Sequence, residues 1–192
     1  MTTELALETE TVAFLDRACA DPALEREWVD LLSQLEYVGF RKITKAIRYD
    51  QVSLETLRHA SEEASHAFLM KAAAEKMGLP ERSWKDNPYS EAGWRYFQGL
   101  DRGVEAKIAD PARCYPLVSV AVERRVLALY PAYLERTKNS DVRRAVTRIL
   151  AQEKQHAALF DERTLPAEEV EFACRLEEKL WVEMIRSADK LI

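Results

Sequence analysis

Apolar side chains recur along most of the chain at the three- and four-residue spacing of a helix with one buried face. The first long segment begins at Asp21-Pro22, an N-cap residue followed by proline at the first helical position, and extends to about Tyr49. A second segment begins after Ser53 and ends near Met77, where glycine and proline follow. The pattern therefore predicts a hairpin of two long helices in the first half of the chain.

The second half repeats this arrangement. A helix is predicted over residues 116–137, and Asn139-Ser140 caps a further helix that continues to about residue 162. Another helix is predicted over residues 166–191, and residues 3–19 have the pattern of an additional N-terminal helix. Prolines and glycines interrupt residues 80–115, which we expect to form a long crossover with one or two short helices. Helices in this order are compatible with any all-α bundle.

Length and composition favour one domain over residues 1–192. A chain of 192 residues with 47% hydrophobic and 32% charged residues can bury one sizeable core and is too short for two. Five glycines and seven prolines leave little material for the turns of an all-β fold. The net charge of -5 argues against a nucleic-acid surface that covers the whole domain.

Cysteine usage and hydropathy indicate the compartment. Cys19, Cys114 and Cys174 lie far apart without a CxxC pair, so neither a disulfide framework nor a cysteine metal site is expected. A reducing cytoplasm fits this usage best. Acidic residues interrupt the first twenty positions, where a signal peptide would need an apolar run, and no run of 18 apolar residues predicts a membrane span.

Candidate chemistry enters with the histidines, of which there are three. Two of them follow a glutamate by three residues, in Glu63-Ala-Ser-His66 and Glu153-Lys-Gln-His156. This spacing places both side chains on one helical face, close enough to bind the same metal centre. One such motif is a weak signal, whereas two on the second helix of each hairpin are a much stronger one.

Each of these glutamates lies in an apolar stripe, and the first helix of each hairpin carries one more such acid. These are Glu36 and Glu123. Because an unpaired buried carboxylate is costly, such groups are normally paired, protonated or bound to metal. All six candidate side chains lie 12 to 17 residues from the turn of their hairpin, which is roughly 20 Å at helical rise. Six side chains at one height predict a metal site, although ion-paired glutamates and satisfied core histidines are the alternative.

His59 lies one turn before Glu63 on a similar face but lacks the ExxH spacing. We expect it to stand behind the ligands or at the surface. Tyr130 lies two turns after Glu123 on the same face and is a candidate hydrogen-bonding or oxidation partner of the site, although most buried tyrosines only pack.

The six side chains resemble the ligand pattern of the ferritin-like dimetal-carboxylate superfamily over about residues 24–162. The resemblance implies a ferritin-like four-helix bundle, made of two antiparallel hairpins joined by a long crossover. It implies two metal ions, Fe/Fe or Mn/Fe, and neither haem nor flavin. It further implies that Glu63 and Glu153 bridge the ions. Terminal ligands would be Glu36 and His66 on one ion, and Glu123 and His156 on the other.

No subgroup motif is recognised. Rubrerythrins that carry a rubredoxin module need cysteine pairs, bacterioferritin has a haem methionine where Ala64 stands, and storage ferritins usually lack a counterpart of His156. The long interval between His66 and Glu123 is more similar to oxygenase-type members, such as aldehyde-deformylating oxygenases or the tRNA hydroxylase. The resemblance thus implies an oxidase or oxygenase that uses O2, a small organic substrate and an external electron donor. A ferroxidase and a rubrerythrin-type peroxidase are the alternatives.

RNA and a second copy of the chain are two further candidate partners. Basic residues that could form an RNA-binding patch are Arg41, Lys42, Lys45, Arg48, Arg124, Arg125, Arg143, Arg144 and Arg148. The acidic overall balance disfavours RNA, since a charge run is usually a solvated helix face. The helix predicted over 166–191 could pack on the bundle or form a homodimer contact.

Overall fold

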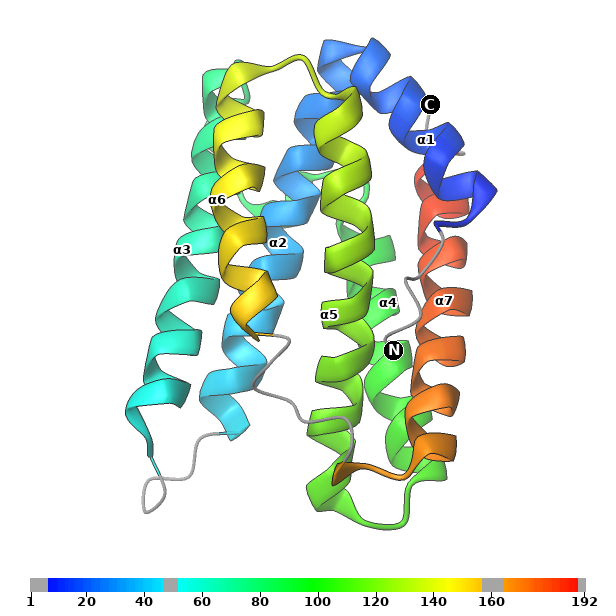
Figure 1. The fold of residues 1–192 in the computed structure, drawn as a ribbon. Helices are drawn as coiled ribbons and strands as arrows, with labels where there is room; N and C mark the ends of the chain where they lie inside the picture. Colours follow the sequence, from blue (N-terminus) through cyan, green and yellow to red (C-terminus); the bar gives the residue numbers. More distant parts are fainter. Residues whose placement is uncertain (1–6, 47–51, 157–163, 190–192) are drawn as a thin grey trace.

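The computed structural model describes residues 7–46, 52–156 and 164–189, which form seven α-helices and one 3-10 helix (Figure 1). No strand is present in these residues, so the prediction of an all-α protein is confirmed. The helices are α1 (Thr9–Ala20), α2 (Pro22–Ala46), α3 (Leu54–Lys76), η1 (Trp84–Asp86), α4 (Ser90–Lys107), α5 (Pro111–Arg136), α6 (Ser140–His156) and α7 (Ala167–Asp189).

Two antiparallel hairpins form the centre of the bundle (Figure 1). One is α2 with α3, the other is α5 with α6, and the hairpins meet where α3 packs against α6. Helix α4 contacts α2 and α5 and packs along α7, while α1 lies across one end of the bundle against α2, α5 and α7. None of the described helices is both long and apolar enough to cross a membrane.

Helix starts follow the predicted caps. Ser53 Oγ accepts a hydrogen bond from the backbone N–H of Thr56 at 3.0 Å, and Asn139 Oδ1 accepts one from that of Asp141 at 2.9 Å. Asp21 Oδ1 accepts from the backbone N–H two residues further on. The ends predicted for three helices fall in residues 47–51, 157–163 and 190–192, outside the described residues, as does the start of the predicted helix 3–19. In the described residues that helix begins at Thr9.

The crossover differs from the prediction. Besides the short helix η1 it holds the 18-residue helix α4, which is longer than predicted, and α5 begins at Pro111 rather than Pro116. Asp110 caps α5, since its Oδ1 accepts from the N–H of Ala112 at 3.0 Å. The glycines of α4 are packing positions rather than breaks. A Cβ at Gly99 would lie 3.0 Å from a methyl carbon of Leu180 on α7, and Gly103 faces Leu176 in the same way.

The apolar stripe of α7 packs on the bundle. Trp181, Met184 and Ile185 are buried in the same core as Trp28 of α2. These side chains therefore pack on the bundle and do not form a dimer contact. A homodimer through other surfaces stays a prediction.

Candidate metal centre

All six predicted side chains meet inside the bundle, from α2, α3, α5 and α6. The ring of His66 is fully buried, and its Nδ1 faces three carboxylates. Nδ1 lies 2.9 Å from Glu153 Oε1, 3.6 Å from Glu36 Oε2 and 3.8 Å from Glu63 Oε1. The helices thus bring Glu36 and Glu153, which are 117 residues apart in the sequence, to the same histidine ring.

His156 completes the link between the two motifs. Its Nδ1 lies 3.3 Å from Glu153 Oε2 and 3.4 Å from Glu63 Oε1. Both glutamates therefore contact both histidines of the ExxH motifs. This central position is the one that a pair of bridging carboxylates would occupy.

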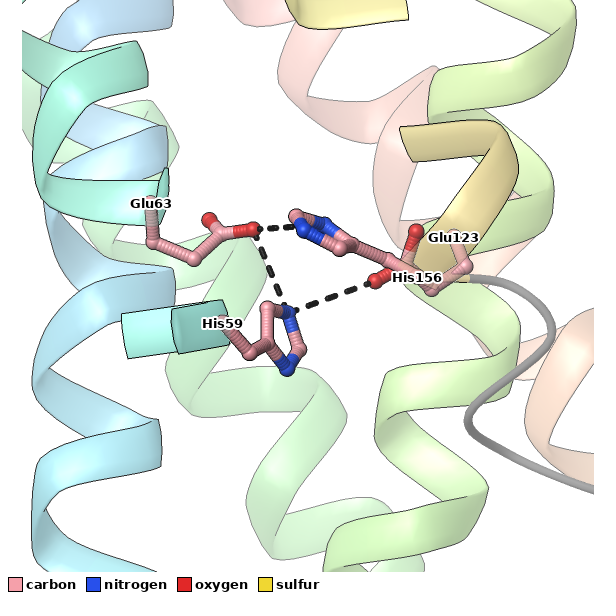
Figure 2. Close-up of side chains that lie close together, drawn as sticks. All are labelled: His59, Glu63, Glu123 and His156. Atoms are coloured by element: carbon pink, nitrogen blue, oxygen red, sulfur yellow. Dashed lines mark ion pairs between the residues drawn. The ribbon is translucent and has the colours of Figure 1, made fainter. Parts of the chain in front are cut away.

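His59 also belongs to the cluster, contrary to the expectation of a place behind the ligands or at the surface. It is buried, and its Nε2 lies 3.4 Å from Glu63 Oε1 and 3.9 Å from Glu123 Oε1 (Figure 2). Its ring centroid is 4.1 Å from that of His156. Positions 59, 63 and 66 share one face of α3 at spacings of four and three residues. The ExxH motif does not include position 59, although the spacing of four residues could have indicated it. We call Glu36, His59, Glu63, His66, Glu123, Glu153 and His156 the carboxylate–histidine cluster.

The donor atoms of this cluster fall into two groups of metal-binding size. Each residue of a group offers one ligand atom, and these atoms lie within 4.8 Å of one another. A metal ion about 2.1 Å from each donor separates opposite donors by about 4.2 Å, so small side-chain shifts would close either group around an ion. Glu63 belongs to both groups. One group is His59, Glu63, Glu123 and His156, and the other is Glu36, Glu63, His66 and Glu153.

Hydrogen bonds from behind orient two of the histidines. His66 Nε2 lies 3.1 Å from Gln152 Oε1, and His156 Nε2 lies 2.7 Å from Glu62 Oε2. An Nε2–H donated to each of these oxygens leaves the Nδ1 lone pair directed at the centre, which is the arrangement of metal-ligating histidines. The contacts are reciprocal, because the residue before each ExxH glutamate holds the histidine of the other hairpin. Neither Glu62 nor Gln152 was predicted, although each directly precedes a motif.

The carboxylates of the cluster are not paired with a lysine or arginine of the described residues. Among the described residues, the recorded contacts of its four glutamates are with histidines, with Tyr130 and, for Glu123 and Glu153, with each other, and none is with lysine or arginine. Two buried polar atoms, His66 Nδ1 and Glu123 Oε2, have no hydrogen-bond partner. Nδ1 is close to Glu153 but not aligned for a hydrogen bond. Buried polar atoms without a hydrogen-bond partner are expected where an ion binds.

The pKa values respond to the same crowding. Burial raises the pKa of Glu36 to about 7, and burial together with Glu153 raises that of Glu123 well above its ordinary value. Burial alone would lower the pKa of His66, but the facing carboxylates of Glu153 and Glu36 raise it to about 11. For His156 the same opposition raises the pKa to about 10. Without a metal, the cluster therefore holds protons on His66 and His156.

Tyr130 is buried beside the cluster and donates a hydrogen bond to Glu36 Oε1. Burial and the Glu36 carboxylate raise the pKa of the phenol well above its ordinary value, so it stays a donor. The contact confirms the hydrogen-bonding position anticipated for this tyrosine, while an oxidation role stays a prediction.

An apolar cavity of about 90 Å³ adjoins the cluster, and we call it the inner cavity. Its wall includes the carboxylates of Glu36, Glu63, Glu123 and Glu153, and the remaining surface is mostly aliphatic and aromatic. Gly39 keeps this region open, because a Cβ there would lie 2.9 Å from Glu63 Oε2.

Comparison with family models, with curated proteins and with solved structures finds no match to this chain. The assignment of the site therefore depends on its geometry. That geometry also removes Arg125 from the basic patch considered above, since its guanidinium is buried between Glu8 and Glu177.

Proposed function

We propose that this chain is a ferritin-like dimetal-carboxylate oxidase or oxygenase that acts on a small organic substrate. One observation carries the proposal: four buried glutamates and three histidines from four helices form two donor groups that share Glu63. Mixed carboxylate and imidazole donors suit iron and manganese, so Fe/Fe and Mn/Fe are the candidate pairs.

Within this proposal each donor has a place. Glu63 would serve both ions, because it belongs to both donor groups, and Glu153 would assist it, because it contacts both His66 and His156. Glu36 and His66 would complete one site. Glu123, His156 and His59 would complete the other, so that His59 would be a seventh ligand beyond the six predicted from the sequence.

Two adjacent redox-active ions, when bound, supply the electrons that reduce O2. The protein would orient the ligand side chains and exclude water from the site. Tyr130 fixes Glu36 by a hydrogen bond, and Gln152 and Glu62 fix the rings of His66 and His156. The inner cavity reaches the Glu36 and Glu123 carboxylates through apolar walls, which favours an organic substrate over an iron-storage route. Repeated turnover then needs an external electron donor.

Metal analysis of protein from iron-supplemented cells tests the proposal. We expect two ions per chain, and fewer than one in Glu63→Gln, because this carboxylate belongs to both groups. Glu25→Gln is the control: Glu25 is likewise a buried glutamate, but it lies on α2 and pairs with Tyr133 and Thr137. Two retained ions in Glu63→Gln would reject the assignment.

Addition of Fe(II) in air separates the alternatives. An oxygenase saturates near two irons per chain, whereas a storage protein continues to take up iron. A peroxidase of rubrerythrin type would oxidise its diferrous form much faster with hydrogen peroxide than with O2.

A further inference from the structure

A second depression lies outside the bundle, between α2 and the α4 and η1 segments, and we call it the α2–α4 groove. It encloses about 1090 Å³. Aromatic side chains line it, including Trp94, which is 48% exposed, and Tyr37 and Trp84, whose ring centroids lie 4.8 Å apart. The groove also contains Phe97 and Lys42, and both of these residues line the inner cavity as well. The two spaces therefore meet at one pair of side chains.

Lys42 stands at this junction in an unusual setting. Its side chain is only 20% exposed, its ammonium pairs with Asp101 of α4, and Nζ lies 5.2 Å from the centroid of the Phe97 ring. Burial lowers the pKa of Lys42 against the opposing effect of Asp101. A lysine placed in this way extends its apolar stem along the cavity wall and presents one positive charge at the entrance.

The charge of the groove supports an anionic ligand. Its charged lining residues are Arg41, Lys42, Lys45, Lys85, Glu91 and Asp101, four positive and two negative, which gives a local balance of +2. The whole chain has a net charge of -5. A positive entrance on an acidic protein concentrates anions at that point.

The distance from entrance to cluster sets the size of the ligand. Lys42 follows Glu36 by six residues on α2, which is about 9 Å along the helix axis. Gly39 lies between them and presents no side chain to this path. A molecule held by its charged end at Lys42 would therefore bring a medium-length apolar tail to the carboxylates.

We propose that Lys42 is a specificity-determining residue that binds the anionic head group of an amphipathic substrate, whose apolar part fills the inner cavity beside the cluster. The inference rests on the proposed function, since the cavity is taken as the place of reaction. A carboxylate and a phosphate share the required chemistry, and the probes below separate them.

Isothermal titration of the metal-loaded protein with octanoate, octyl phosphate, octylamine and 1-octanol tests the proposal. We expect saturable binding of octanoate or octyl phosphate, and the tighter of the two identifies the head group. Octylamine should bind at least tenfold more weakly, because it brings a second positive charge to Lys42. Equal binding of octylamine or 1-octanol would overturn the proposal.

Variants locate the head group. Lys42→Met should weaken binding of the anionic probe at least tenfold, and Lys42→Arg should restore it to within a few fold. Lys76→Met is the control, since Lys76 is an exposed lysine of α3 paired with Asp141, outside the groove. Unchanged affinity in Lys42→Met, with the far-ultraviolet circular dichroism of the wild type, would overturn the inference. Failure of the proposed function is recognised separately, as a wild-type protein without two bound metal ions.

Discussion

Two clusters of buried charge lie side by side in this bundle, and they are completed in different ways. The first, which we call the Arg125 cluster, contains Arg125, Glu8, Glu177 and Tyr96. Arg125 donates to Glu177 at 3.0 and 2.9 Å and to Glu8 at 2.9 and 2.6 Å, and the hydroxyl of Tyr96 donates to Glu177 at 2.8 Å. A guanidinium between two carboxylates satisfies both in bidentate geometry.

The carboxylate–histidine cluster has more acids and no such cation among the described residues. Its glutamates face imidazole rings, and His66 Nδ1 and Glu123 Oε2 remain without partners. Burial and these contacts raise the pKa values of Glu36, His66 and Glu123. The Arg125 cluster is closed by a fixed cation of the chain and therefore holds helices together. The carboxylate–histidine cluster is balanced by protons on His66 and His156, which a metal ion can replace, and therefore has the properties of a binding site.

Removal of the guanidinium gives the largest expected effect. Arg125→Met leaves Glu8 and Glu177 facing each other in the interior, so the free energy of unfolding should fall by about 3–5 kcal/mol. Urea denaturation of the metal-free protein measures this loss. Glu63→Gln, measured in the same way, should change stability far less, because it relieves crowding among carboxylates. A loss in Glu63→Gln equal to that in Arg125→Met would abolish the distinction between the two clusters.

The second prediction concerns pH. The pKa values of His66 and His156 are raised to about 11 and about 10, and a metal ion must displace these protons. Metal affinity should therefore rise with pH, by up to about tenfold per unit for each proton released. Titrations in buffers of different ionisation enthalpy at pH 8 should show about two protons released per chain. Affinity independent of pH between 6.5 and 9 would contradict the prediction.

The raised pKa values of the two histidines should make the metal-free protein less stable as pH rises. A histidine whose pKa is higher in the folded than in the unfolded chain contributes stability that is complete below about pH 6.5. This contribution is lost as pH rises towards the folded values of about 10 and 11. Denaturant midpoints of metal-free protein should therefore decrease over this interval. In Arg125 the guanidinium keeps its charge, so the Arg125 cluster should not add to the trend.

The smallest expected effect is that of replacing Glu62, which contacts the cluster from behind. Glu62→Ala removes the acceptor of His156 Nε2 without replacing a proposed ligand, and should weaken metal binding about 10- to 100-fold. Glu75→Ala, an exposed glutamate on the same helix, is the control. Competition with a chromophoric chelator measures both. Equal affinities for the two variants would show that Glu62 does not orient the ring.

Sequence reasoning succeeded where one local rule acted alone. Ser53 and Asn139 cap helices because their side chains reach backbone donors two or three residues further on. The six ExxH and lone-acid candidates were found because a carboxylate in an apolar stripe conflicts with burial unless it has a partner. Their common distance from the turns predicted that they would meet, and the contacts of His66 confirm this for Glu36, Glu63 and Glu153.

Sequence reasoning failed where contacts with a segment far away in the sequence determine the local structure. Gly93, Gly99 and Gly103 were interpreted as interruptions of a helix, yet each faces a leucine of another helix that leaves no room for a side chain. Tertiary contact thus outweighs the low helix propensity of glycine. His59 was misplaced for a related reason. Its own spacing lacked the motif, and only the approach of α5 and α6 brings Glu123 and His156 against it.

The reciprocal bonds of Glu62 and Gln152 have a consequence for the order of assembly. Neither hairpin alone contains an oriented pair of histidines, because each ring is held from across the interface. A nascent chain that has folded only its first hairpin therefore offers an immature set of donors. Under the proposed function, metal capture should follow hairpin docking during biogenesis, so that the ions would enter only when the interior of the bundle is closed.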